Sequence, residues 1–295
     1  MAIRKSPQRT AFLVFDYAFL LLSALLCLFP LVHVLAISFS SAVAAAAGRV
    51  SIFPVEFTLA SYEYVASKGA FWTAFGVSVM RIALILPLTL LVTVMAAYPM
   101  SKSAKVFRAR PFYTYFLLIT MLFSGGLIPW FLTIRGLGIN NTIWALVIPG
   151  IAQVFNTILL MNFIRDLPAE LEEAAVVDGG GPLTILFRII LPLMKPALAT
   201  ISLFVIVGNW NEWFTGIILM DHPSKYPLQS YLQSIISPTT NIQLIDPKNL
   251  DLLKKINERT FKAAQIFIAM FPVLVLYPFL QKYFTKGLVL GSVKG

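Results

Sequence analysis

The sequence predicts an all-α membrane protein with six transmembrane helices and a cytoplasmic helical loop. Hydrophobic residues make up 58% of the 295 residues and charged residues only 12%, whereas a soluble domain carries about 45–50% and about 25%. A helix needs about 20 mostly apolar residues to cross a bilayer. Six stretches reach this length, namely 12–38, 71–99, 112–133, 142–163, 197–220 and 264–284. The composition excludes an ordinary soluble enzyme and a disordered chain.

The first stretch, 12–38, is expected to be a retained helix and not a cleaved signal peptide. Basic residues precede it, as they do in a signal peptide. Its apolar run continues from Ala11 to Phe39, which is much longer than the ~7–15 residues of a signal-peptide core.

The other five stretches are interpreted as helices because each is long and nearly free of charge. The second contains Arg81, and the fifth ends in a polar group at residues 209–213. Prolines recur within or beside the spans, where they kink helices whose freed carbonyls are satisfied by neighbouring helices. These prolines are Pro30, Pro87, Pro99, Pro129, Pro149, Pro272 and Pro278.

The distribution of Lys and Arg predicts that both termini are cytoplasmic. The N-terminus, the loop 100–111 and the C-terminal tail are richer in these residues than segments 40–70 and 134–141, and cytoplasmic loops carry the excess of Lys and Arg. The net charge of +10 is therefore attributed to membrane topology and not to nucleic-acid binding. We expect one membrane domain, 1–295, with a cytoplasmic loop at 164–196 and an external loop at 221–263.

Several kinds of chemistry have no signal in this chain. The G-x-x-x-x-G-K-[ST] loop that holds nucleotide phosphates is absent, as are H-E-x-x-H and G-x-S-x-G. One cysteine and two histidines provide almost no material for a metal centre. We therefore expect no catalysis, metal or cofactor on this chain, and any ATP-Mg must be bound by a partner ATPase.

The loop 164–196 predicts a helix, a turn and a second helix. Pro168 suits a first helical turn, and the acids at positions 170, 172 and 173 complement the positive end of a helix. The glycines at 179–181 stop this helix, and Pro182 starts the next one. A short helix with small apolar side chains suits insertion into a partner's groove. The alternative, a helix lying on the membrane surface, is opposed by its acids because the cytoplasmic leaflet is anionic.

Seven positions of this loop follow the pattern E-A-A-x3-G-x9-I-x-L-P, namely Glu173, Ala174, Ala175, Gly179, Ile189, Leu191 and Pro192. The pattern resembles the signature of permease subunits of bacterial ABC importers. Segments 124–129, 209–213 and 291–295 are similar to the carbohydrate branch of that family, of the maltose- and alginate-importer type. The resemblance covers nearly the whole chain.

The resemblance implies the fold of a type I ABC importer permease and a defined set of partners. These are a second homologous permease, two ATPase subunits, a periplasmic or extracellular solute-binding protein, an oligosaccharide substrate and membrane lipid. It also implies that the loop is a coupling helix seated in the ATPase, with Glu173 as its charged anchor and Gly179 as its turn. The C-terminal tail, including Lys294, would reach the ATPase pair, and transport would proceed by alternating access.

Two groups inside the spans are candidates for pore or substrate contact. Arg81 is either a cavity cation facing an acidic sugar or the binding protein, or an arginine that extends outward or pairs with Glu212. The polar group at residues 209–213 either lines the pore or forms hydrogen bonds between helices. It comprises Asn209, Trp210, Asn211, Glu212 and Trp213.

The sequence therefore favours the permease subunit of an ATP-driven oligosaccharide importer, with an acidic, alginate-like substrate favoured by the net charge and Arg81. The external loop 221–263, with Lys254 and Lys255, is expected to dock the solute-binding protein. The alternatives are a secondary transporter and a membrane scaffold. Neither inverted repeats nor a proton-relay chain supports the former, and the coupling-loop pattern argues against the latter.

Overall fold

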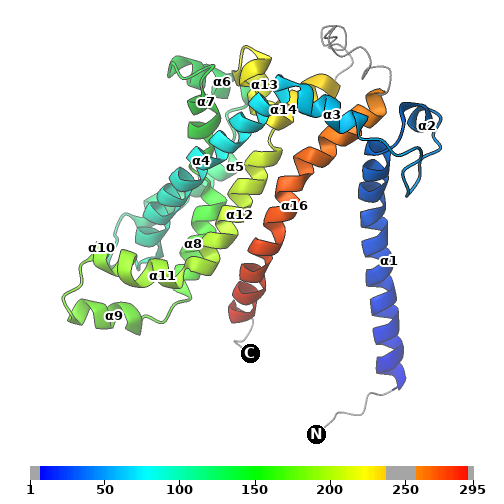
Figure 1. Cartoon of the computed structure of the whole chain (residues 1–295). Coiled ribbons are helices and arrows are strands. Elements are labelled where there is room, and N and C mark those ends of the chain that lie inside the picture. The colour runs from blue at the N-terminus through cyan, green and yellow to red at the C-terminus, as the bar shows by residue number, and fades with distance from the viewer. Residues whose placement is uncertain (1–6, 237–256, 292–295) are drawn as a thin grey trace. The chain divides into compact units, whose positions relative to one another are not determined.

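The computed structural model describes residues 7–236 and 257–291, in which helices are joined by loops and no strand occurs (Figure 1). Residue contacts divide the chain into two compact units, Met1–Gly69 with Ile236–Phe271 and Ala70–Ile235 with Pro272–Gly295. The all-α prediction is confirmed.

The first unit contains α1 (Pro7–Ser38), α2 (Ala42–Ala46), α3 (Ala60–Ser67) and the beginning of α16 (Glu258–Gly291). Nearly all of α1 is exposed, as expected for a helix in contact with lipid. The Tyr64 and Phe261 rings pack edge to face with centroids 5.2 Å apart. Asn257 Nδ2 donates to Ala42 O at 2.7 Å. These contacts hold the start of α16 against α2 and α3.

The second unit has a core built mainly from α4, α8 and α12. The α8 helix packs against both α5 and α12, and the side chains of Ile85, Leu160 and Ile201 are almost fully buried. The helices of this unit are α4 (Gly69–Ser101), α5 (Arg110–Leu122), α6 (Leu127–Gly136), α7 (Ile143–Val147), η1 (Ile148–Gly150), α8 (Val154–Arg165), α9 (Glu170–Val177), α10 (Pro182–Ile185), η2 (Leu186–Ile190), α11 (Leu191–Leu193), α12 (Lys195–Asn211), α13 (Phe214–Leu219), η3 (Pro223–Lys225) and α14 (Leu228–Ile236).

Within the described residues, two helices, α1 and α4, are long and apolar enough to cross a membrane unbroken, and three bent helix pairs raise this number to at most five. The sixth predicted span, 264–284, falls on α16, whose side chains are described as far as Val275 and at Pro278. A count of six is therefore not reached among the described residues. The two unbroken helices match the predicted spans 12–38 and 71–99 closely.

The predicted span 112–133 is not one continuous helix. The α5 and α6 helices are bent by 115°, because residues 123–126 leave the helical conformation. Gly126 has φ +86°, a region that glycine enters without steric cost. The sequence predicts that Gly125 and Gly126 lie inside this span, because two glycines lower the mean hydropathy of a long apolar stretch only slightly.

The fourth and fifth predicted spans are also interrupted. The segments Ile143–Gly150 and Val154–Arg165 are bent by 44°, and Pro182–Leu193 and Lys195–Asn211 by 77°. The predicted span 197–220 is wrong at its C-terminal end, because α12 stops at Asn211 and Glu212 is extended. The polar group that the sequence placed inside a helix therefore lies at a helix end.

Gly216 is tightly enclosed, and we expect Gly216→Ala to destabilise the protein. A Cβ there would lie 2.2 Å from Ser230 Oγ and 2.7 Å from Pro227 Cδ, and overpacking of this kind costs about 1–3 kcal/mol. Gly208 is the matched control, because a Cβ there meets nothing within 4 Å and alanine is the better helix former. Thermal unfolding in detergent should show a lower Tm for Gly216→Ala only. Equal Tm values would contradict the packing.

Candidate functional site

The loop that carries the seven-residue pattern begins with α9 and a glycine turn. Gly179 has φ +77°, and its N–H donates to Val176 O at 3.0 Å. The N–H of Gly180 donates to Ala175 O at 2.8 Å. A Cβ on Gly180 would lie 2.7 Å from that carbonyl oxygen. The next helix, α10, starts at Pro182, so the predicted helix–turn–helix is confirmed.

The two halves of the pattern lie in different environments. Glu173 and Ala174 are exposed and Ala175 is half-buried, while Ile189 and Leu191 are half-buried and Pro192 is exposed. The neighbouring side chains of the second half belong to the core, namely Ile185, Leu186 and Ile190. The second half of the loop is therefore packed into the protein, whereas the acidic end of α9 faces outward.

The loop is also attached to the end of α4. Lys102 forms an ion pair with Glu172, and its Nζ lies 4.1 Å from the centroid of the Tyr98 ring. Arg165 Nη2 donates to Met100 O at 3.0 Å. A largely apolar groove of ≈ 930 Å³ lies between α9, α10 and this end of α4. Sequence reasoning missed Lys102, because its only signal was membership of a basic loop.

Arg81 is a buried group with a partner. Its Nη1 lies 2.8 Å from Glu212 Oε2, and its side chain is 5% exposed, compared with 27% for Glu212. Glu212 also accepts from the N–H of Thr215 at 2.8 Å. Of the readings that the sequence left open, the structure shows the pairing with Glu212. The pair joins α4 to the segment between α12 and α13.

The rest of the polar group is split by the end of α12. Asn209 donates to Val205 O at 2.8 Å within the helix. Trp210 is 5% exposed and packs against Phe75 with centroids 5.6 Å apart, so it lies in the interior and not along an opening. Asn211 and Trp213 are exposed.

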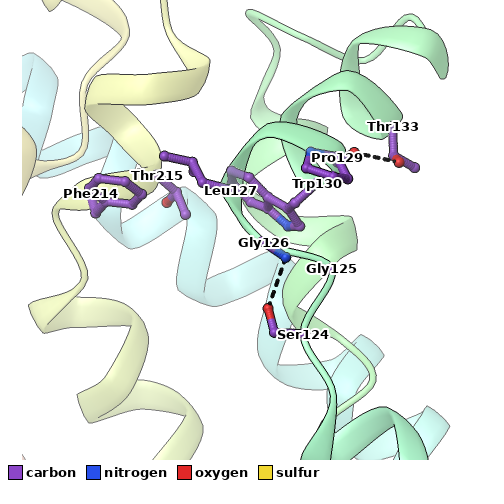
Figure 2. Close-up of a pocket in the computed structure, with 9 residues that line it drawn as sticks. All are labelled: Ser124, Gly125, Gly126, Leu127, Pro129, Trp130, Thr133, Phe214 and Thr215. Atoms are coloured by element: carbon purple, nitrogen blue, oxygen red, sulfur yellow. Dashed lines mark hydrogen bonds between the residues drawn. The ribbon is translucent and has the colours of Figure 1, made fainter.

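A pocket of ≈ 520 Å³ lies beside the non-helical segment 123–126 that separates α5 from α6. Phe214 and Thr215 from α13 face Leu127 and Trp130 of α6 across it (Figure 2). We call it the break pocket, and its lining residues are Ser124, Gly125, Gly126, Leu127, Pro129, Trp130, Thr133, Phe214 and Thr215. In the sequence, segment 124–129 carries only a family resemblance and gives no sign of the pocket, since helix breaks are not visible in hydropathy.

Part of the predicted external loop contacts the segment before α7. Lys225 Nζ donates to Asn141 O at 3.1 Å, and Asn141 N donates to Leu219 O at 3.0 Å. Segments 134–141 and 221–225 therefore lie together. Lys254, Lys255 and Lys294 lie outside the described residues.

Comparison with known proteins identifies the family. Residues 102–289 match the model of the family described as binding-protein-dependent transport system inner membrane component. The chain belongs to this family. It is a permease component of an ABC importer and not an enzyme, since ATP hydrolysis belongs to a partner subunit of such importers. Permeases of this kind work with a further permease, an ATPase and a solute-binding protein.

The relatives include permease proteins of polysaccharide and oligosaccharide transport systems. The polygalacturonan/rhamnogalacturonan transport system permease protein YtcP of Bacillus subtilis is 38% identical over 95% of this chain and 96% of the relative. Protein LplC of the same organism is 38% identical over 90% and 89%. A crystal structure of a bacterial ABC transporter that imports the acidic polysaccharide alginate superposes with a TM-score of 0.87, at 32% identity over 96% of this chain and 100% of that chain. The resemblance inferred from the sequence is confirmed.

The Arg81–Glu212 pair predicts an asymmetric response to substitution. Glu212→Gln leaves the more buried guanidinium without its counter-ion, which costs about 3 kcal/mol or more. Arg81→Met leaves a carboxylate that is partly exposed and still bonded to Thr215, so its cost should be smaller. Thermal unfolding in detergent should rank the Tm of Glu212→Gln below that of Arg81→Met, with partial recovery in the double variant. The reverse ranking would contradict this account.

Proposed function

We propose that this chain is the permease subunit of an ABC importer for an acidic oligosaccharide and that α9 couples it to the ATPase. One observation carries the coupling proposal. The α9 helix presents exposed acids and exposed apolar side chains on a loop whose second half is packed into the core.

The surface of α9 suits a protein partner better than water alone. Val176 and Val177 are 61% and 86% exposed, although burial of such side chains stabilises by about 1.5 kcal/mol or more each. Glu173 is exposed beside them and forms no ion pair among the described residues. A groove with apolar walls and a basic residue would satisfy both groups. ATP-Mg is assigned to the two ATPase subunits, because this chain has no phosphate-binding loop.

Two sets of contacts support the proposed topology. The loop 100–111 and the loop 164–196 are joined through Lys102–Glu172, and segment 134–141 is joined to the start of 221–263 through Asn141. The Lys and Arg distribution predicts that the loops 100–111 and 164–196 lie on one side of the membrane and that segments 134–141 and 221–263 lie on the other. We therefore assign the coupling loop and both termini to the cytoplasm. Segment 221–263 is assigned to the outside, where it would dock the solute-binding protein.

The substrate class rests on the relatives and not on a charged site in this chain. YtcP carries the name of a polygalacturonan and rhamnogalacturonan system, and the similar crystal structure belongs to an alginate importer. Both substrates are acidic polysaccharides. Of the two sequence features that favour an acidic sugar, the net charge and Arg81, the second is weaker in the structure, because Glu212 neutralises Arg81.

Charge reversal on α9 tests the coupling. Glu173→Lys should lower binding-protein-stimulated ATP hydrolysis and transport by more than about tenfold in the reconstituted importer, because a charge at a protein interface is replaced by its opposite. Glu63→Lys on α3 is the matched control, since Glu63 is also exposed but lies outside the loop. It should leave both rates unchanged. Normal coupling by Glu173→Lys would exclude the docking role.

Reporter fusions test the topology. A reporter fused after Gly295, or inserted at Gly181 in the coupling loop, should be active only in the cytoplasm. A reporter inserted at Asp221 should be active only outside. Two reporter enzymes are compared at each position, one that is active only in the cytoplasm and one that is active only outside. Activity of the Gly181 and Asp221 fusions on the same side would refute the proposed orientation.

A further inference from the structure

We propose that the break pocket binds a sugar ring of the transported oligosaccharide by stacking and hydroxyl contacts, without an ion pair. This inference rests on the proposed function and assigns part of the substrate path to this subunit. It is carried by three features of the pocket: the non-helical backbone on one side, the aromatic and hydroxyl lining, and the neutralised ion pair behind it.

The non-helical backbone indicates a polar environment. Ser124, Gly125 and Gly126 are all exposed, and no side chain caps the start of α6 at Gly126. Backbone that leaves the helix at membrane depth is tolerated only where protein buries it or where it lines a water-filled cavity. The N–H of Gly126 donates to Ser124 Oγ at 3.2 Å. The carbonyl oxygen of Gly126 accepts from the N–H of Trp130 at 3.3 Å. The exposed backbone of Ser124 and Gly125 can face water or a ligand.

The lining residues match the two kinds of surface on a sugar. A pyranose ring has faces of C–H groups and an edge of hydroxyl groups. Trp130 and Phe214 provide aromatic surfaces, and aromatic rings combine a large contact area with a defined geometry. Ser124, Thr133 and Thr215 provide hydroxyl groups around them (Figure 2). The volume of ≈ 520 Å³ falls within the roughly 300–1,000 Å³ of small-molecule sites.

Trp130 is held in a fixed position by the protein. It is half-buried and packs against the cluster formed by Ile134, Leu146 and Leu219. Thr133 is also fixed, because its Oγ1 donates to Pro129 O at 2.8 Å (Figure 2). A site built from such fixed side chains loses little conformational entropy when a ligand binds.

The pocket has no charged lining residue. Glu212 lies behind Thr215, whose N–H and Oγ1 both donate to it, and Arg81 neutralises Glu212. A sugar carboxylate therefore gains no counter-ion here and meets no net repulsion from the pair. The break pocket should accept neutral and acidic rings alike. Discrimination in favour of an acidic substrate would then have to arise elsewhere in the importer.

Substrate protection tests binding independently of transport. Cys27 is the only cysteine in the chain, so a Cys27→Ser background allows labelling at one chosen position. In the complete importer with its binding protein, a galacturonate trisaccharide and a galactose trisaccharide should each slow maleimide labelling of Ser124→Cys. Thr120→Cys is the control, because Thr120 is exposed on α5 and outside the pocket. Its labelling should not change. Equal labelling of Ser124→Cys with and without both sugars would overturn the inference.

Transport kinetics provide the second test. Trp130→Ala should raise the KM for whichever trisaccharide is transported by about tenfold, the equivalent of one lost stacking contact. Trp130→Phe should restore most of the affinity. Trp144→Ala is the matched control, since Trp144 is 44% exposed and outside the pocket. Copurification with the second permease and the ATPase checks assembly of each variant.

The outcomes separate this inference from the proposed function. If the unmodified importer transports a trisaccharide and the KM is equal for Trp130→Ala and Trp144→Ala, the inference alone is overturned. Loss of the second permease from Trp130→Ala complexes would show a subunit contact in place of a sugar site, and this also overturns it. Failure of the unmodified importer to transport either trisaccharide overturns the proposed substrate class and the inference with it.

Discussion

The need to satisfy backbone hydrogen bonds in an apolar solvent governs this structure. A chain in hydrocarbon has no water to bond its exposed N–H and C=O groups. The backbone N–H and C=O groups of a spanning segment must therefore form hydrogen bonds within the protein. The apolar stretches of the described residues are helical for this reason, and α1 and α4 are long and apolar enough to cross without a break. Each departure from the helix therefore requires a local explanation. The most pronounced, between α5 and α6, coincides with a pocket.

The α4 helix links the two regions to which we assign function. At one end it meets the coupling loop, where Lys102 forms an ion pair with Glu172 and a cation–π contact with the Tyr98 ring. Arg81, about 30 Å away at 1.5 Å per residue, pairs with Glu212 beside the break pocket. The C-terminal end and the middle of α4 are thus each tied by a charged contact to a segment that is distant in sequence. A helix that contacts both regions could take part in the rigid-body movement expected of alternating access.

The seven-residue pattern of the coupling loop combines two physical roles. Gly179 is needed for a backbone conformation with positive φ, and the region around Ile189 packs into the core beside Ile190. Glu173 and Ala174 remain exposed, although Glu173 also complements the positive end of α9. A pattern that mixes folding residues with exposed ones is expected where a rigid loop presents a surface to a partner.

From the sequence we could predict the class of protein, the bounds of α1 and α4 to within a few residues and the helix–turn–helix of the coupling loop. These features depend on mean hydropathy and on local capping by residues such as Pro182 and Gly179, which act within a few positions of the chain. Tertiary packing alone sets the breaks in three spans, the burial of Trp210, the Lys102–Glu172 pair and the break pocket. It also selects the Arg81–Glu212 pair from the alternatives that the sequence left open. Each joins residues that are far apart in sequence or depends on a backbone turn that hydropathy averages away, and no local pattern encodes which distant side chain will meet a buried charge.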